Sequence, residues 1–179
     1  EQTKQIILEK NVTTENVDET AHDVGVGAVV FNELSNYRIK DYVFSWDKVL
    51  NFEGETGPYV QYTHARACSI LRRAGEETVS AAKEGFDASC ITGESAHHLI
   101  KLLYALPEVI AEAGEKYEPS IVTRHIVDIA QGFNKFYHDE HILVEDEKEK
   151  TAKVALVLAV QTAIKNGLGL LGMKAPEKM

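Results

Sequence analysis

Two tyrosines and two arginines recur at helical spacing in the segment GPYVQYTHARACSILRRA, which begins at Gly57. At about 100° per residue, Tyr59, Tyr62, Arg66 and Arg73 fall on one narrow stripe of a helix. Tyrosine rings stack on bases, and the planar guanidinium group binds phosphate through paired hydrogen bonds. This combination is typical of a nucleic-acid-binding surface. The same side chains would also fit a core in which the rings are buried and Arg66 pairs with a carboxylate.

A helix is predicted to position this stripe. Gly54, Gly57 and Pro58 indicate a turn directly before it. Pro58 suits the first position of a helix, because its ring fixes φ and its missing N–H would be unpaired there. An apolar arc beside the stripe predicts that one face of the helix packs against a core. Its members are Val60, Thr63, Ala67, Ile70, Leu71 and Ala74.

Other residues with reactive or metal-binding chemistry favour structural roles. Residues 138–141 (HDEH) could share a metal ion, but they do not form an HExxH pattern and their acidic surroundings are typical of a solvated loop. His97 and His98 are adjacent and point in different directions on a helix. Cys68 and Cys90 form no metal-binding spacing, and Cys68 is predicted to be a small buried thiol. The sequence contains neither a nucleophile elbow nor a phosphate-binding loop.

The run GETGPYVQYTHARACSILRRAG, residues 54–75, resembles the start of the C-terminal anticodon-binding domain of class I arginyl-tRNA synthetases. The resemblance covers essentially the whole chain, through LSNYRIKDYVFSWDKVLNFEG upstream and the terminal LLGMKAPEKM. It implies an all-α helical bundle of the class I aminoacyl-tRNA synthetase anticodon-binding type. It also implies a piece of a larger enzyme, in which residues 1–51 are a linking helical segment after the catalytic domain and residues 52–179 are the anticodon-binding domain.

The resemblance implies which residues contact RNA. Tyr59, Tyr62 and Arg66 match the family pattern YxxYxxxR, whose members lie on the tRNA side of the domain. Arg73 continues the same stripe and is included with them. Paired arginines at a helix end, here Arg72 and Arg73, also serve simply to offset the helix dipole.

Two further candidates come from the resemblance. The segment FNKFYHDEHIL, residues 133–143, resembles the helix end near the anticodon pocket, which makes Tyr137 a candidate for stacking on an anticodon base. A ring packed beside Phe133 is an equally good interpretation of Tyr137. The chain ends in Met179 after a PExM-like stretch, and in the family this terminus helps to shape the anticodon pocket. A thioether against a base face is physically reasonable.

Composition and charge limit the classes of partner. The 179 residues are 44% hydrophobic and 26% charged, which is typical of a globular chain. No apolar run approaches the roughly 20 residues that span a bilayer, so we expect no membrane partner. The net charge of −9 disfavours non-specific attraction to phosphate, although residues 148–179 hold six basic and two acidic side chains. We expect a selective RNA binder in the cytoplasm, with no DNA partner.

Hydrophobic spacing at three and four residues predicts helices along most of the chain. Residues 1–10 are expected to end a helix, with Thr13 and Thr14 as caps for the next one. Gly25 and Gly27 indicate close helix packing, and Gly167 is expected directly after the last helix, before a tail that folds back. The predicted helices are 15–36, 46–51, the stripe helix from Pro58, 76–83, one opened by Glu94 or Ser95, one started by Pro107, one started by Pro119, and 148–166.

These observations favour a tRNA anticodon-binding domain of arginyl-tRNA synthetase, whose partners would be the anticodon stem-loop of arginine tRNA and the catalytic domain of the same polypeptide. The resemblance implies that the parent enzyme uses ATP with Mg. This chain lacks the HIGH-like and KMSKS-like signatures, so we expect no catalysis and no cofactor in it alone. Two alternatives remain: a helical protein-interaction module without RNA binding, and a stand-alone enzyme that uses His97, His98, His138 or His141.

Overall fold

A computed structural model describes residues 3–5 and 16–179 of the chain, and these residues form helices and loops without a strand. The predicted all-α fold is therefore confirmed. Its main elements are α2 (Val17–Ser35), α3 (Trp46–Val49), α4 (Gly57–Ala74), α5 (Glu76–Glu84), the short 3₁₀ helix η1 (Ala88–Cys90), α6 (Glu94–Lys116), α7 (Ser120–Asp139) and α8 (Glu147–Leu170).

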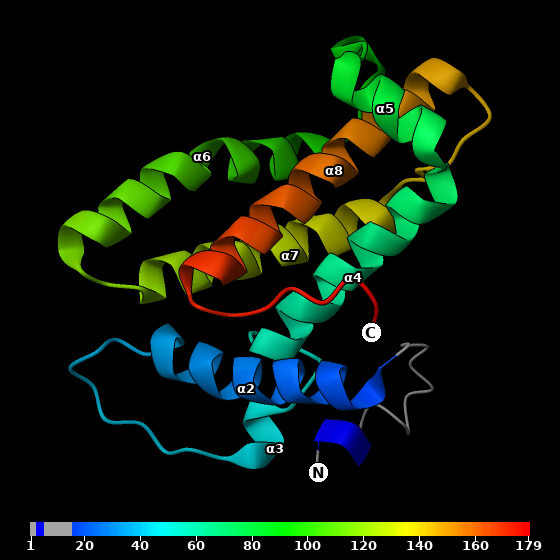
Figure 1. The fold of residues 1–179 in the computed structure, drawn as a ribbon. Helices are drawn as coiled ribbons and strands as arrows, with labels where there is room; N and C mark the ends of the chain where they lie inside the picture. Colours follow the sequence, from blue (N-terminus) through cyan, green and yellow to red (C-terminus); the bar gives the residue numbers. More distant parts are fainter. Residues whose placement is uncertain (1–2, 6–15) are drawn as a thin grey trace.

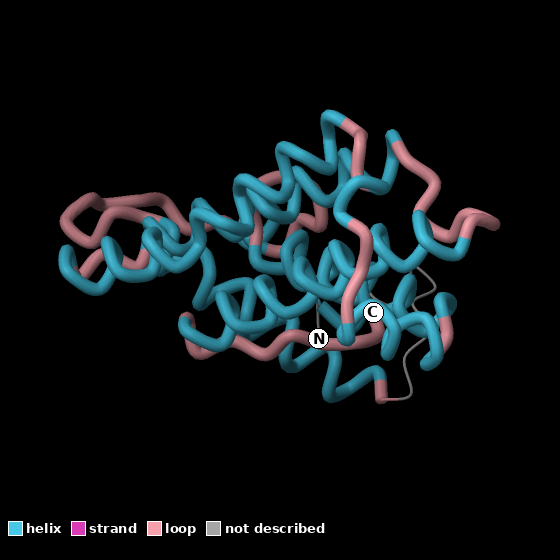
Figure 2. Tube along the Cα trace, turned by 90° about the horizontal axis from the view of Figure 1, so that it is seen from above, coloured by secondary structure: helices cyan, strands magenta, loops and turns pink. Residues whose placement is uncertain are grey.

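The long helices pack in layers around one main core (Figure 1). α6 packs along α7, α8 contacts α4, α5 and α7, and α2 packs against α4 and α7. From above, the helices lie side by side and are joined by loops (Figure 2). Large apolar side chains that are fully buried fill the core: Phe31, Leu99, Ile126, Ile129, Phe133, Phe136, Ile164 and Leu168. No described helix has both the length and the apolar character required of a membrane span.

α2 and α4 cross at two glycines. A Cβ atom on Gly57 would lie 2.8 Å from Cβ of Phe31 and 2.9 Å from the carbonyl oxygen of Gly27. A Cβ atom on Gly27 would lie 2.8 Å from Nε2 of Gln61. Only residues without a side chain allow this approach, so the expected packing role of Gly27 is confirmed.

The N-terminal third begins its helices close to the predicted positions. The expected caps Thr13 and Thr14, and most of the helix expected at 1–10, lie outside the described residues. Asn16 caps α2 instead, and its side chain accepts a hydrogen bond from the backbone N–H of Glu19 at 3.2 Å. Ser45 precedes α3, but its side chain makes no capping hydrogen bond.

Pro107 does not start a helix, and this prediction is wrong. It lies inside α6, which is continuous from Glu94 to Lys116. The missing N–H removes one helical hydrogen bond, but the ring faces solvent while Leu99, Leu106 and Ala113 are buried on both sides of it. Both halves of α6 therefore bury their apolar residues in the same core. The free energy gained by this burial outweighs the loss of one helical hydrogen bond.

The predicted end of the last helix at Gly167 is also wrong. α8 continues to Leu170, and Gly172 adopts the left-handed conformation at φ 73°. The N–H of Met173 donates to the carbonyl of Leu168 at 2.9 Å, and that of Gly172 donates to Gly169 at 3.0 Å. These two bonds form a Schellman motif, which turns the chain back. Gly167 instead lets α8 approach α7, since a Cβ atom there would lie 2.5 Å from Ile126.

Candidate nucleic-acid interface

α4 starts at a well-defined cap that fixes the direction of its side chains. Thr56 accepts a hydrogen bond from the N–H of Tyr59 at 3.2 Å, and Pro58 lies in the first turn, one residue later than predicted because Gly57 opens the helix. The predicted apolar arc faces the core: Val60, Thr63, Ala67 and Ile70 are buried, and Leu71 and Ala74 are partly buried.

The predicted stripe is accessible to solvent. The side chain of Tyr62 is 37% exposed, Tyr59 and Arg66 are half-buried, and Arg73 is exposed. The interpretation of Tyr62 as a core ring is therefore wrong. Arg66 also pairs with an amide, as described next, and no described carboxylate forms an ion pair with it. α4 thus presents rings and guanidinium groups beside a buried face.

Asn134 on α7 connects the stripe to a second helix. Its side-chain carbonyl accepts a hydrogen bond from the Arg66 guanidinium group. Its amide nitrogen donates to the hydroxyl of Tyr59 at 2.9 Å and to that of Thr63 at 3.1 Å. One amide therefore fixes three side chains of α4. Sequence reasoning missed Asn134, although a mid-helix asparagine is disfavoured unless its side chain has a partner.

Arg66 lies between two accessible rings. Its Cζ atom is 5.0 Å from the centre of the Tyr62 ring and 5.5 Å from that of Tyr137. Both distances are within the range of cation–π attraction. The structure thus brings Tyr62 and Arg66 of α4 together with Tyr137 of α7. Asn134 connects Tyr59 to the same group.

One side of the Tyr137 ring packs on the core. Phe136 is fully buried, whereas the next residue, Tyr137, is 42% exposed. The Tyr137 ring lies nearly parallel to that of Phe133, at a centroid distance of 6.5 Å and an angle of 29°. Tyr137 therefore packs on Phe133, as one of its two interpretations expects, and part of its ring remains open to solvent.

The model of the DALR anticodon binding domain family matches residues 60–179. The chain belongs to this family. It is 54% identical over 179 residues to an arginine–tRNA ligase of Halothermothrix orenii and 55% identical over 179 residues to one of Alkaliphilus metalliredigens. All of this chain matches in both cases, and it spans 31% of the length of each curated relative.

A solved structure has the same fold as this DALR domain. The arginyl-tRNA synthetase of Thermus thermophilus superimposes with a TM-score of 0.90 at 32% sequence identity, over 99% of this chain and 30% of that chain. The family and the helical architecture expected from the sequence are both confirmed.

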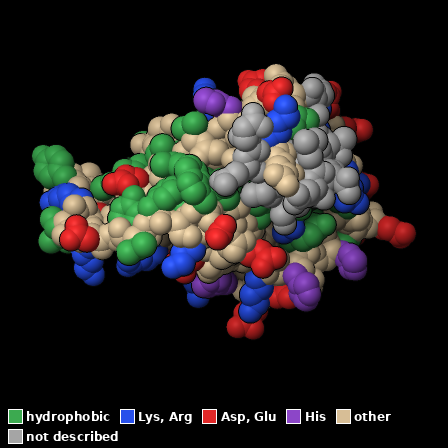
Figure 3. All heavy atoms as spheres, turned by 90° about the horizontal axis from the view of Figure 1, so that it is seen from below, with side chains coloured by type: hydrophobic (Ala, Val, Ile, Leu, Met, Phe, Trp, Pro, Cys, Tyr) green, Lys and Arg blue, Asp and Glu red, His purple; other side chains and the backbone are tan. Residues whose placement is uncertain are grey.

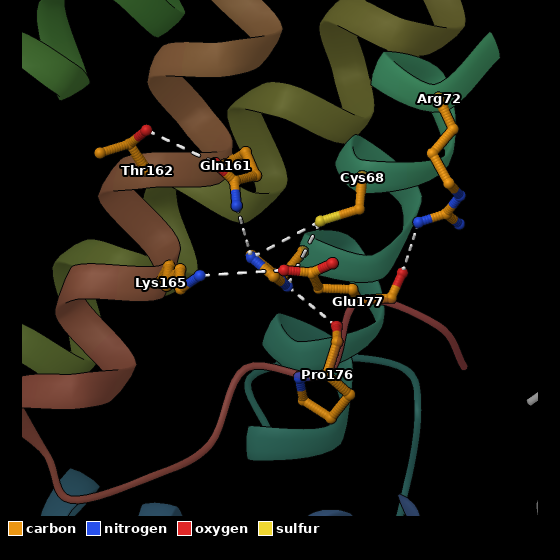
Figure 4. Close-up of polar contacts among 8 residues, drawn as sticks. Cys68, Arg72, Gln161, Thr162, Lys165, Pro176 and Glu177 are labelled. Atoms are coloured by element: carbon orange, nitrogen blue, oxygen red, sulfur yellow. Dashed lines mark hydrogen bonds and ion pairs between the residues drawn. The ribbon is translucent and has the colours of Figure 1, made fainter. Parts of the chain in front are cut away.

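Asn134 and the side chains joined to it directly or through Arg66 form a group that we call the Asn134 cluster: Tyr59, Tyr62, Thr63, Arg66, Asn134 and Tyr137. The other two predicted site residues of the DALR domain lie outside it. Arg73 is exposed, two helical turns beyond Arg66 on the same stripe. Met179 is half-buried at the end of a tail that lies along another side of α4, where Gln61, His64 and Arg72 contact its carbonyls. Nearby, Arg72 donates a hydrogen bond to the carbonyl of Glu177 at 3.1 Å (Figure 4).

Residues 138–141 of the DALR domain make contacts that stabilise the fold. Glu140 accepts a hydrogen bond from Ser95 at 3.1 Å and pairs with Lys153 at 3.4 Å, so this carboxylate ties the end of α7 to α6 and α8. His138 and Asp139 contact each other at the surface. Across the described residues, no group of three or more histidine, cysteine or acidic side chains has a metal-binding arrangement.

The predicted buried thiol is confirmed in the DALR domain. Cys68 is buried in α4, and burial raises the pKa of its thiol. The thiol is therefore protonated at neutral pH and a poor nucleophile. His64, one turn earlier, is fully buried, and burial lowers the pKa of its imidazole. Neither side chain is accessible for chemistry on a substrate.

Proposed function

We propose that this chain binds the anticodon stem-loop of arginine tRNA as the anticodon-binding part of an arginine–tRNA ligase. The observation that carries the proposal is the position of Arg66, between the rings of Tyr62 and Tyr137 and bonded to Asn134, in a chain of the DALR family. Rings and guanidinium groups on adjacent helices can stack on unpaired bases and bind the phosphates between them.

Each site residue has a role in the proposal. Tyr62 and Tyr137 provide partly exposed rings for base stacking, an interaction worth about 1–3 kcal/mol per base. Arg66 provides a fixed fork for a phosphate or a base edge. Tyr59 acts mainly through its hydrogen bond to Asn134.

Two residues outside the Asn134 cluster complete the proposed surface. Arg73 extends it along α4 as an exposed charge. Met179 supplies a thioether at the end of the tail, as the family resemblance implies. The central cytosine of the arginine anticodon is, by the same resemblance, the base that is read.

Local positive charge and an acidic chain together favour selectivity. The net charge of −9 weakens binding to phosphate in general. RNA binding must then depend on the few side chains around Arg66 whose orientation is fixed. Stacking on the rings among them requires bases that are not already stacked in a helix. A single-stranded loop offers such bases, whereas a regular duplex does not. This is the reason for preferring an anticodon loop over DNA or duplex RNA.

The rest of the polypeptide would supply the chemistry. We propose that residues 52–179 form the anticodon-binding domain and that residues 1–51 link it to a catalytic domain, which joins arginine to tRNA with ATP and Mg in the cytoplasm. Remote binding energy would then orient the acceptor end of the tRNA.

The segment between α2 and α3 fits contact with that remaining part of the polypeptide. Ile39 and Val43 of this segment are 77% and 90% exposed. Figure 3 shows hydrophobic side chains gathered on one face of the molecule. Arg38, in this segment, donates hydrogen bonds to the carbonyls of Lys116 and Tyr117 at the end of α6. The segment is therefore anchored on the bundle while its apolar side chains point outward.

A binding titration tests the proposed function. Fluorescence anisotropy of a labelled anticodon stem-loop of arginine tRNA should show saturable binding to the chain that weakens steeply with salt. A stem-loop with its central anticodon base replaced should bind about tenfold more weakly. Equal affinity for unrelated stem-loops, or no binding at low salt, would contradict the proposal and leave the protein-interaction alternative.

A further inference from the structure

The outer face of α6 carries apolar side chains in contact with solvent. α6 lies at the edge of the bundle and packs along α7 with its other side (Figure 1). Tyr104 is 86% exposed and Ile100 is 37% exposed. Exposed apolar residues follow one another at steps of four, three and four residues, which places them on one stripe of the helix. We call this surface the outer α6 stripe: Ile100, Tyr104, Pro107 and Ala111.

The outer α6 stripe exists because α6 continues through Pro107. The stripe lies roughly 120° around the helix from Leu99 and Leu106, which are buried in the core. A helix that borders the core on one side usually carries polar residues on the opposite side. Apolar residues that form a continuous exposed surface, in contrast to scattered ones, indicate a contact surface.

The charges beside the outer α6 stripe differ in sign along the helix. Lys101 is exposed next to the first half of the stripe, and Glu108 and Glu112 are exposed next to the second half. All three lie on the same side of the stripe, within about 40° of one another around the helix. Glu112 also pairs with Lys116 at 2.5 Å, but this pair is exposed and contributes little to stability. One edge of the stripe is therefore basic at its beginning and acidic at its end.

A second copy of this chain fits that pattern if the two α6 helices pack antiparallel. A two-fold axis that passes between Tyr104 and Pro107 makes the stripe complementary to itself. It places Tyr104 opposite Pro107 of the second copy. It also places Ile100 opposite Ala111 of the second copy. Each large side chain thus faces a smaller one, which allows the two helices to pack closely.

The same two-fold axis brings opposite charges together. Lys101 lies opposite the interval between Glu108 and Glu112 of the second copy, and the symmetry repeats this contact. Parallel packing would instead place Lys101 opposite the same residue of the second copy, where like charges repel. Charge complementarity therefore favours a second copy, in the antiparallel orientation, as the partner of the stripe.

We propose that the outer α6 stripe is the interface of a weak antiparallel dimer of this chain. One helix from each copy makes a smaller interface than the standard of about 1,600 Å², so the expected dissociation constant is on the order of 100 µM. The dimer goes beyond the proposed function and does not rest on it. It uses α6, whereas the Asn134 cluster consists of residues from α4 and α7, so the two surfaces are separate.

Sedimentation equilibrium of the chain without RNA tests for the dimer. Over a concentration range of about 10 µM to 1 mM, which brackets the expected dissociation constant, the average mass should rise from that of a monomer toward that of a dimer. A wild-type chain that stays monomeric over the whole range would overturn the proposal.

Tyr104→Ala shows whether the dimer forms through the stripe. The substitution removes the largest side chain of the stripe from both copies and should raise the dissociation constant at least about tenfold. Val43→Ala is the matched control, because Val43 is 90% exposed but lies between α2 and α3, and it should leave the dissociation constant unchanged. A dimer that Val43→Ala weakens as much as Tyr104→Ala does, or that Tyr104→Ala does not weaken, would overturn the proposal.

Charge reversal tests the antiparallel orientation. Lys101→Glu would face two glutamates, and the double variant Glu108→Lys/Glu112→Lys would face a lysine, so each variant alone should be monomeric. Mixed in equal amounts, the two variants should form a heterodimer about as stable as the wild-type dimer, because both contacts then join opposite charges. All three side chains are exposed, so the circular dichroism of each variant should match that of the wild type. Folded variants that stay monomeric when mixed would overturn the proposal.

The dimer and the proposed function can fail separately. Tyr104→Ala should bind the arginine anticodon stem-loop with the affinity of the wild-type chain, because anisotropy is measured far below the dissociation constant of the dimer. A chain that binds RNA but never dimerises would show that only the dimer is wrong. A chain that dimerises through the stripe but binds no RNA would show that only the proposed function is wrong.

Discussion

Arg66 and Asn134 are 68 residues apart in the chain, and the guanidinium group of Arg66 donates a hydrogen bond to the side-chain carbonyl of Asn134. The amide group of Asn134 also donates to Tyr59 and Thr63. α4 and α7 are therefore connected at the point where the proposed RNA surface lies. A side chain that is ordered before binding loses less entropy on binding, so Asn134 pre-organises Arg66.

Asn134→Ala should weaken RNA binding and lower stability together. The substitution removes the partner of three α4 side chains, so we expect about a tenfold rise in Kd and a loss of about 1–2 kcal/mol in the free energy of unfolding. Anisotropy and urea unfolding measure the two effects. Asn166→Ala is the control, because Asn166 is an exposed asparagine of α8 and its replacement should leave the Kd unchanged. Unchanged RNA binding in Asn134→Ala would contradict the pre-organisation of Arg66.

Tyr137→Ala should weaken RNA binding about fivefold to a hundredfold, the range expected for one lost base stack. The ring is 42% exposed and packs on Phe133 with one side, so the melting temperature should fall by only a few degrees. Tyr104→Ala on α6 is the matched control, because that ring is 86% exposed. If both variants bind RNA as well as the wild type, Tyr137 is a packing residue only.

Arg73→Ala should change the salt dependence of binding. If Arg73 contacts a phosphate, the slope of log K against log salt concentration should fall by about 1. Tyr137→Ala should leave the slope as it is, since stacking releases no counterions. Arg124→Ala, at an exposed position of α7, serves as the control for loss of one positive charge. The same slope change in Arg73→Ala and Arg124→Ala would show that only net charge matters.

Gly57→Ala should destabilise the fold by about 1–3 kcal/mol. The new Cβ atom would lie 2.8 Å from Cβ of Phe31 and 2.9 Å from a backbone oxygen of α2, so the two helices must separate. Gly114→Ala in α6 is the control, because no atom lies within 4 Å of its Cβ position. It should stabilise the chain by about 0.5–1 kcal/mol. Urea unfolding of both variants should therefore give changes of opposite sign.

Stability should fall as the pH drops, in part because of His64. Burial lowers the pKa of His64 in the folded chain, so the unfolded chain, with a pKa of about 6.5, binds this proton more readily. The contribution of His64 is thus fully present above pH ~6.5 and is lost as the pH falls toward its lower folded value. His64→Asn should flatten the pH dependence of the free energy of unfolding, whereas the exposed control His97→Asn should not. Identical curves for His64→Asn and the wild type would contradict this.

The sequence predicted the parts of the fold that depend on local signals. The stripe and arc of α4 follow from the spacing of Tyr59, Tyr62 and Val60. Pro107 was misinterpreted because a proline is a strong local stop signal, and the packing of both halves of α6 against the core is not visible locally. Gly167 was misinterpreted for the same reason, because its role is contact with Ile126 on α7.

The candidate site could be predicted one helix at a time. Tyr62 and Arg66 are recognisable on α4, and Tyr137 is recognisable by resemblance. Asn134 and His64 were not predicted, because each acts through partners far along the chain. A buried polar side chain needs a partner, but the sequence does not say where that partner lies.

The central claim is that RNA binds where α4 meets α7, and NMR titration of the isotope-labelled chain with the arginine anticodon stem-loop tests it most directly. We predict that the signals of Tyr62, Arg66, Asn134 and Tyr137 shift with one common affinity, while those of Tyr104 stay in place. Shifts confined to other surfaces, such as the segment between α2 and α3, or no shifts at saturating RNA, would contradict it.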